Sequence, residues 1–119
     1  MNRDVNQKQY NLEERTLQFA GRTMDYIDVL PKTTTNSEIG RQLARAAGSV
    51  GANYIEANES LGKKDFLMRI KISRKEAKES RYWLNLSKPR QEQTKGKEHL
   101  IKESTELMNI FGAILQKSK

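Results

Sequence analysis

Hydrophobic residues recur every three or four positions over four stretches of this chain, and that spacing predicts four amphipathic helices. The stretches cover residues 11–30, 36–60, 63–87 and 94–117. Pro31, Gly62 and Pro89 lie between them, and proline and glycine commonly end helices. Apolar and polar residues do not alternate over any long run, and the chain has no Asn-Gly or Asp-Gly turn, so no strand is expected.

Each predicted helix carries one apolar stripe, about 120° wide, suited to a shared core. In chain order, the expected core positions are Leu12, Thr16, Phe19, Ala20, Thr23, Tyr26, Ile27, Leu30, Ile39, Leu43, Ala46, Ala47, Val50, Tyr54, Ala57, Leu61, Phe66, Ile70, Ser73, Ala77, Ser80, Leu84, Leu100, Ser104, Leu107, Met108, Phe111, Ile114 and Leu115. Short connections favour an all-α, antiparallel up-down-up-down four-helix bundle, with one domain over residues 1–119. A three-helix domain with a loosely attached first helix is the alternative.

The second helix has two unusual features. At its start, Thr35 and Glu38 match a capping box, with Asn36 and Ser37 as competing caps. A glycine inside a helix costs about 1 kcal/mol relative to alanine, so glycines on one face indicate the close approach of another backbone. The face opposite the core stripe carries Gly40, Ala44, Gly48, Gly51, Ala52 and Ile55. The alternative is a kinked or flexible helix with no partner on that face.

The third helix carries a basic arc beside its core stripe. The arc is about 120° wide at 100° per residue and contains no acidic residue. Its members are Lys64, Lys71, Arg74, Lys75, Lys78 and Arg81. Cations repeated every three or four residues match a row of phosphates, whereas the alternative is a plain solvated face. Of the nearby aromatics, we expect Tyr82 and Trp83 to point away from the arc, so base-specific recognition is not predicted.

A third face of the same helix combines aromatic, aliphatic and acidic residues: Asp65, Arg69, Ile72, Glu76, Glu79 and Trp83. Aromatic residues are enriched in protein interfaces, and this face lies far from the core stripe. We therefore expect an interface between subunits, formed with the small-residue face of the second helix. Its predicted residues are Gly48, Gly51, Ile55, Ile72, Glu76, Glu79 and Trp83. The alternative is that Trp83 folds back over its own bundle.

The net charge of +7 is concentrated in one segment. Residues 63–102 hold thirteen Lys and Arg against five Asp and Glu, so the rest of the chain is close to neutral. A cationic segment of this kind indicates an anionic partner, although charge also serves solubility.

Several function classes lack support in the sequence. With no cysteine and His99 as the only histidine, neither a metal site, a cofactor nor a catalytic dyad is expected. The chain has no P-loop, dinucleotide fingerprint or EF-hand loop, so we do not expect an enzyme. It also has no long apolar run and no signal-peptide pattern near the N-terminus, so we expect a cytoplasmic protein with no membrane partner.

A set of residues in the second and third helices resembles a known family. The segments 42–57 and 75–84, with Phe66 between them, are similar to the bacterial 23S rRNA intervening-sequence proteins. The matching residues are Arg45, Ala46, Ser49, Asn53, Glu56, Glu76, Glu79, Arg81, Tyr82, Trp83 and Leu84. The resemblance covers about residues 11–117. It implies an up-and-down four-helix bundle that assembles into a homopentameric ring. It also implies relatedness to the accessory variability determinant of diversity-generating retroelements, which binds nucleic acid and a reverse transcriptase.

These observations lead to one main hypothesis and one alternative. The main hypothesis is a non-enzymatic, ring-forming helical protein that binds RNA or DNA through phosphate contacts. The basic arc would make these contacts, with Arg41 and Arg45 as additional cations. The alternative is a scaffold or accessory subunit that docks a protein partner, for example a reverse transcriptase, and has no direct contact with nucleic acid.

Overall fold

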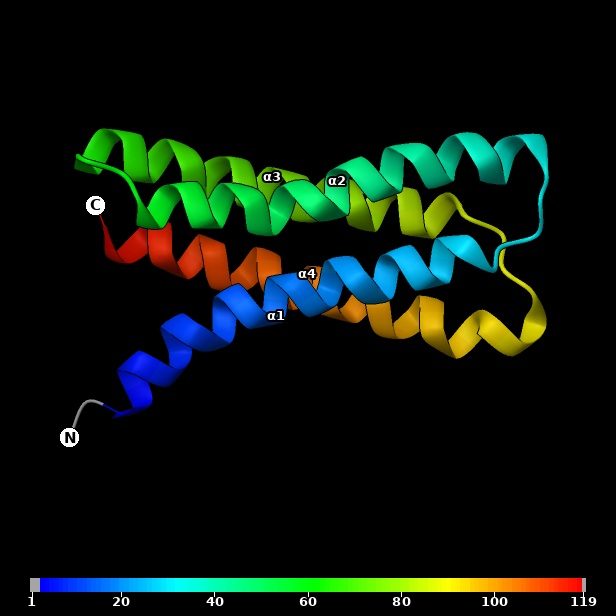
Figure 1. The fold of residues 1–119 in the computed structure, drawn as a ribbon, viewed down its shortest axis with the longest axis horizontal. Helices are drawn as coiled ribbons and strands as arrows, with labels where there is room; N and C mark the ends of the chain where they lie inside the picture. Colours follow the sequence, from blue (N-terminus) through cyan, green and yellow to red (C-terminus); the bar gives the residue numbers. More distant parts are fainter. Residues whose placement is uncertain (1–2, 119) are drawn as a thin grey trace.

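Four long helices joined by short connections make up the described part of this protein (Figure 1). The computed structural model describes residues 3–118, and the side chains of residues 12–118. Helix α1 spans Arg3–Asp28, α2 spans Thr34–Asn58, α3 spans Lys63–Leu86 and α4 spans Thr94–Lys117, with a 3-10 turn at Gln91–Gln93. Over the described residues there is no strand, and the all-helical prediction is confirmed.

The predicted boundaries of the last two helices agree with the structure to within one residue, but those of the first two differ. Helix α1 begins at Arg3, eight residues before its predicted start. Helix α2 begins at Thr34 because Thr33 is its N-cap, whose hydroxyl accepts a hydrogen bond from the backbone N–H of Asn36 at 3.1 Å. The predicted capping box of Thr35 and Glu38 is therefore wrong, since both residues already lie inside the helix.

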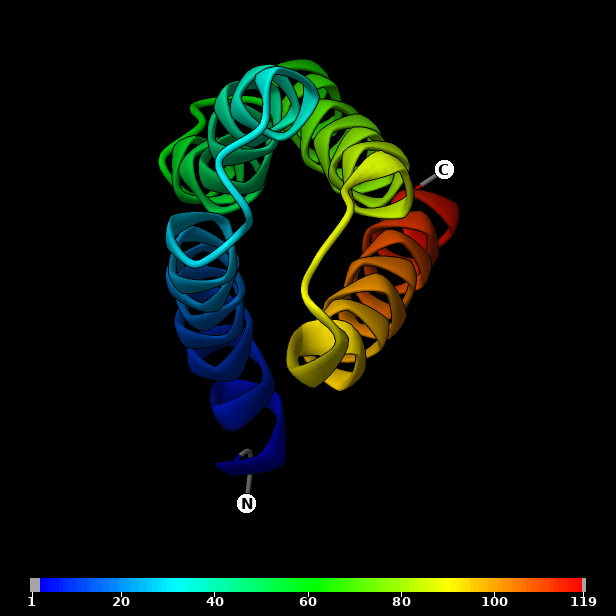
Figure 2. The same cartoon turned by 90° about the vertical axis from the view of Figure 1, so that its right-hand side faces the viewer.

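Successive helices run in opposite directions, so the start of α1 and the end of α4 lie at the same end of the molecule (Figure 1). Seen along the helices, α1, α2, α3 and α4 follow one another around an arc (Figure 2). The contacts of α3 with α2 and α4 are the most extensive, and those between α1 and α4 are fewer than those between α1 and α2. None of the helices in the described part of the chain is both long enough and apolar enough to cross a membrane.

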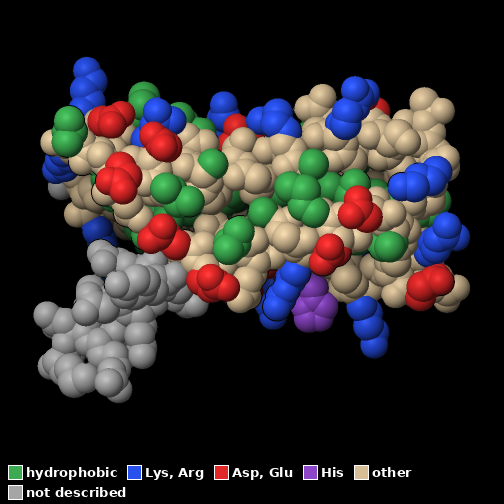
Figure 3. Space-filling view, viewed as in Figure 1, with side chains coloured by type: hydrophobic (Ala, Val, Ile, Leu, Met, Phe, Trp, Pro, Cys, Tyr) green, Lys and Arg blue, Asp and Glu red, His purple; other side chains and the backbone are tan. Residues whose placement is uncertain are grey.

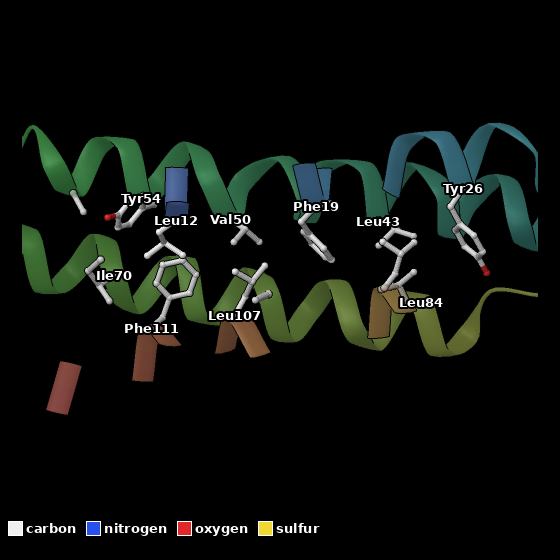
Figure 4. Close-up of a cluster of buried hydrophobic side chains, with 14 of the residues drawn as sticks. Leu12, Phe19, Tyr26, Leu43, Val50, Tyr54, Ile70, Leu84, Leu107 and Phe111 are labelled. Atoms are coloured by element: carbon white, nitrogen blue, oxygen red, sulfur yellow. The ribbon is translucent and has the colours of Figure 1, made fainter. Parts of the chain in front are cut away.

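Side chains from all four helices meet in one row along the inside of this arc (Figure 4). Leu12 and Phe19 come from α1, Leu43 and Val50 from α2, and all four are buried. Others in the same cluster are Tyr26, Tyr54, Ile70, Leu84, Leu107 and Phe111. One expected core residue is exposed, because Leu61 lies in the turn before α3 and its side chain points to solvent.

Small side chains let the helices approach closely. The hydroxyl of Ser73 on α3 donates to the backbone carbonyl of Val50 on α2 at 2.9 Å, which requires nearly touching backbones. Other buried hydroxyls donate within their own helix, for example from Thr23 to Phe19 and from Ser80 to Glu76. Each buried hydroxyl therefore has a hydrogen-bond partner, as burial requires.

Asn36 joins the two connections at one end of the bundle. Its side-chain amide donates to the carbonyls of Pro31 and Lys88, and its side-chain oxygen accepts from the N–H of Lys88 at 3.0 Å. The residue is buried. These bonds hold the start of α2 and the α1–α2 connection against the segment that follows α3.

Candidate nucleic-acid interface

A groove of about 490 Å³ runs between α3 and α4. One wall is formed by four cations of α3, one turn or less apart: Lys71, Arg74, Lys75 and Lys78. The other wall is formed by Met108, Asn109 and Gly112 of α4. The four cations are exposed, so the groove presents a row of positive charge directly to solvent.

The α4 wall carries no charge, and at one point it has no side chain. A Cβ atom at Gly112 would lie 3.8 Å from Nη1 of Arg74, so the guanidinium group lies across this glycine. About two turns further along α3, Arg81 Nη1 donates to Thr105 Oγ1 at 3.2 Å. Arg81 therefore extends the cationic row along the same helix pair, with its head fixed by a neutral partner.

Within the described part of the chain, no carboxylate pairs with the groove cations. Among the side chains of residues 12–118, the ion pairs within 4.0 Å are made by Arg15, Arg41 and Arg45. Two acids of α4, Glu103 and Glu106, lie on another side of that helix, since both accept hydrogen bonds from Arg15 of α1. Because nothing neutralises the groove locally, its field is available to an anion.

Lys64 stands apart from the groove. It is exposed in the first turn of α3, two turns before Lys71 and on the same line of the helix. It is placed to meet a long anion that continues past the groove, but it does not line the groove itself.

The structure does not bring Arg41 and Arg45 to this groove. Arg41 lies near the start of α2, is paired with Glu38 one turn away, and borders a separate hollow between α1 and α2. Arg45 spans the other side of α3, where it binds Glu76 at 3.3 Å and also Glu79. The hydrogen bond with Glu76 is the largest cause that raises the pKa of Arg45. Both arginines thus lie away from the groove and have carboxylate partners in the same chain, and their contribution to nucleic-acid binding stays a prediction.

Two residues of the predicted subunit interface are covered by other residues of the same chain. Gly51 is buried against α1, where an added Cβ would lie 2.8 Å from Oγ1 of Thr16. Glu76 is buried beside Arg45. Gly51 and Glu76 are thus unavailable to a second subunit. The close approach expected for the α2 glycines is real, but the approaching helix is α1 of the same chain.

Trp83 and its neighbours are covered only in part. The indole packs against the core cluster, and its Nε1 donates to Glu79 at 3.3 Å. Ile72 and Gly48 are also partly exposed. Ile55 remains 48% exposed, so of the predicted interface residues it offers the most open apolar surface.

An apolar surface lies over α1 and α2. Figure 3 shows hydrophobic side chains gathered along the middle of this face. Exposed apolar residues of these two helices include Leu17 and Met24 of α1 and Ile55 of α2, with Leu17 66% exposed. Leu17, Met24 and Ile55 are called the α1–α2 apolar face below.

The open side of the arc, between α1 and α4, holds a larger groove of about 920 Å³. It mixes charges of both signs, and Arg15 crosses it to bind Glu103 at 2.6 Å and Glu106 at 2.8 Å. No group of three metal-ligating side chains occurs in the part of the chain that the structure describes. Because four acids outnumber three Lys and Arg in its lining, this groove is a weaker anion site than the one between α3 and α4.

Sequence reasoning missed the α4 wall and misplaced Tyr82. Thr105, Asn109 and Gly112 follow one another at helical spacing with no acid between them on that line, and this neutral stripe was the available signal. Tyr82 lies eleven residues after Lys71 in an unbroken helix, which places it only about 20° from that lysine. The expectation that Tyr82 points away from the arc was therefore wrong.

Together, the fold and the groove define an all-helical bundle protein with a row of unpaired surface cations. The family model described as 23S rRNA-intervening sequence protein matches residues 8–113, and the chain belongs to this family. The family resemblance inferred from the sequence is thus confirmed.

A solved structure supports the same assignment. The chain is similar to the crystal structure of a protein with unknown function from the S23 ribosomal protein family of Bacteroides thetaiotaomicron VPI-5482, with a TM-score of 0.76 and 28% sequence identity. The match covers 87% of this chain and 96% of that chain. No curated protein matches the chain.

Proposed function

We propose that this protein binds RNA without catalysis, through phosphate contacts in the groove between α3 and α4. The observation that carries the proposal is the set of four unpaired cations, Lys71, Arg74, Lys75 and Lys78, facing a neutral wall. RNA is the first ligand to test because the family description refers to an intervening sequence of 23S rRNA. Phosphate contacts are also available in DNA, so discrimination between the two comes from other contacts.

Salt dependence is the first test. Each phosphate contact releases counterions, so affinity for single-stranded nucleic acid falls with salt at a slope of about −0.7 per contact on logarithmic axes. Four contacts predict a loss of about 50-fold between 50 and 200 mM salt. The measurement is fluorescence anisotropy with a labelled oligoribonucleotide. An affinity that stays constant over this range contradicts phosphate binding.

Charge reversal then locates the site. The triple variant K71E/K75E/K78E should abolish measurable binding. The matched control K32E/K88E/K95E changes net charge equally at exposed lysines outside the groove, so it should lose only the small, general electrostatic contribution. Equal losses in the two variants would remove the groove from the proposal. No loss in either favours the alternative, a scaffold whose charge serves solubility.

A substitution in the neutral α4 wall tests phosphate binding at a single position of the groove. Gly112 has room for a side chain next to Arg74, since a Cβ there meets only ordinary contacts. Gly112→Glu places a carboxylate among the groove cations and should lower RNA affinity by about 10-fold, whereas the isosteric Gly112→Gln should lower it far less. Equal affinities of the two variants would contradict phosphate binding at this point of the groove.

The proposal includes assembly into a homopentameric ring. The exposed α1–α2 apolar face supports association, because hydrophobic patches on soluble proteins commonly mark interaction sites. The family resemblance supports five subunits. Five copies of a +7 chain carry about +35, so a ring would gather several basic grooves into one strongly cationic surface.

A further inference from the structure

Tyr82 continues the line of the groove cations. Helix α3 is unbroken over Lys63–Leu86, so Lys71, Lys75, Lys78 and Tyr82 follow one another along one side of it. The Tyr82 side chain is 58% exposed. Lys78 lies about one turn, or 6 Å, before it along the axis. An exposed aromatic ring thus stands at the end of a row of unpaired cations.

The Tyr82 ring is supported on one side by the neighbouring tryptophan. Tyr82 meets Trp83 edge to face, with ring centroids 5.1 Å apart and an interplanar angle of 75°. Trp83 is held in turn by its hydrogen bond to Glu79 and by packing against the core. Glu79 is bound by Arg45 of α2. This chain of contacts limits the motion of the Tyr82 ring without covering it.

We propose that Tyr82 is a stacking platform for an unpaired base, and that the preferred ligand is therefore a single-stranded segment of nucleic acid. Its phosphates would lie along the groove cations while one base lies on the phenol ring. Aromatic side chains stack on bases of single strands, whereas the base faces inside a duplex are covered by the neighbouring pairs. This inference rests on the proposed function, since the ring alone supplies no phosphate contact.

The test compares two ligands with equal numbers of phosphates. One is an oligouridine of about twelve nucleotides, and the other is a short RNA hairpin that is paired over nearly all its length. Tyr82→Ala should weaken binding of the oligouridine by about 10-fold and leave hairpin binding unchanged. Tyr82→Phe keeps the ring and should retain binding. Leu86→Ala, which truncates another exposed apolar side chain of α3, is the control and should change neither ligand.

Trp83, the only tryptophan of the chain, provides a second readout. A base that stacks on Tyr82 displaces water beside the indole, so oligouridine should change the Trp83 emission and the hairpin should not. The change should persist in Tyr82→Phe and disappear in Tyr82→Ala.

The outcomes separate the two proposals. Equal weakening of both ligands by Tyr82→Ala, or weakening of neither, overturns the stacking role while groove binding stands. If the wild-type protein binds neither ligand, the proposed function fails and the stacking role fails with it. Light scattering on Tyr82→Ala is the last check. A change of oligomer mass would assign the Tyr82 side chain to a contact between subunits and overturn the inference.

Discussion

Arg45 binds two carboxylates of α3 at once, and one of them is buried. Oε2 of Glu76 lies 3.3 Å from Arg45 Nη1, while Oε1 of Glu76 is buried without a hydrogen-bond partner. A buried carboxylate with a single partner depends heavily on that partner. The Arg45 side chain itself is 49% exposed, so solvent weakens the attraction but does not reach the buried oxygen of Glu76.

Arg45→Ala should therefore destabilise the fold by about 2 kcal/mol, because it leaves the Glu76 carboxylate buried and unpaired. Adding Glu76→Gln to that variant should restore part of the loss, since a neutral amide is less costly to bury. Arg41→Ala is the control, because the Arg41–Glu38 pair is exposed and should contribute less than about 0.5 kcal/mol. Urea unfolding measures all three, and equal losses for Arg41→Ala and Arg45→Ala would contradict this account.

Tyr26 couples α1 to the end of α3. Its hydroxyl and that of Ser87 lie 2.7 Å apart and are both buried. Burial raises the pKa of Tyr26, and the hydrogen bond with Ser87 offsets part of that rise. A raised folded-state pKa means that the contribution of Tyr26 is complete below about pH 10, the pKa of an unfolded tyrosine. That contribution is lost as pH rises through the folded-state pKa.

Tyr26→Phe should cost about 1 kcal/mol at pH 7 through the lost hydrogen bond. The difference in stability between the wild type and this variant should shrink above about pH 10, because only the wild type carries this ionisable group. Urea unfolding at pH 7, 9 and 10.5 measures the difference. A stability difference between the wild type and Tyr26→Phe that stays constant at all three pH values would show that the fold does not raise the pKa of Tyr26.

At the scale of the elements, the glycines of α2 differ in how closely atoms of α1 approach them. A Cβ at Gly51 would meet Thr16 of α1 at 2.8 Å for Oγ1 and 3.1 Å for Cβ. At Gly48 the nearest atom, in Met24, is 4.0 Å away. Gly51 is thus needed for the approach of α1, whereas Gly48 leaves room for a methyl group.

The two alanine variants should consequently change stability in opposite directions. Gly51→Ala should destabilise the protein by about 1–3 kcal/mol, because Thr16 must shift from a hydroxyl position that bonds the carbonyl of Glu13. Gly48→Ala should stabilise it by up to about 1 kcal/mol through helix propensity. Thermal unfolding gives both values. A neutral Gly51→Ala would mean that α1 can move away from α2 at no cost.

In helix α3 the sequence pattern predicted the buried stripe but not the partners of the neighbouring face. The core stripe of Ile70, Ala77 and Leu84 is buried as expected from its spacing. The face of Glu76 and Trp83 was recognised as more than a solvated face, but its partners proved to be Arg45 and the core of the same chain. Helical spacing identifies which residues share a face, whereas the identity of the partner depends on where neighbouring helices lie.

At the scale of the whole molecule, the α1–α2 apolar face is exposed to solvent. Leu17 of α1 and Ile55 of α2 are both exposed, and the α1–α2 apolar face is the candidate for ring contacts. Leu61 is also fully exposed, but it lies apart in the turn before α3. Ile55 and Leu61 therefore form a matched pair of exposed apolar residues, of which only Ile55 belongs to the α1–α2 apolar face.

Light scattering should give a mass of about 68 kDa for the wild type, as five copies of a 13.7 kDa chain require. Ile55→Glu should shift this mass toward that of one chain, because a charge in an apolar interface lacks a partner. Leu61→Glu should leave the mass unchanged. A wild type that scatters as a single chain would refute the ring, and equal masses for the wild type and Ile55→Glu would exclude this face.

The sequence by itself determined the four helices, most of their core positions and the family. Those features depend on local periodicity and on residue identity, which are written along the chain. Only the tertiary structure decided that α1 occupies the glycine face of α2, that Arg45 pairs with α3, and that Gly112 faces Arg74. These contacts depend on the rotation and axial offset of each helix, and the packing of all four helices together sets both quantities.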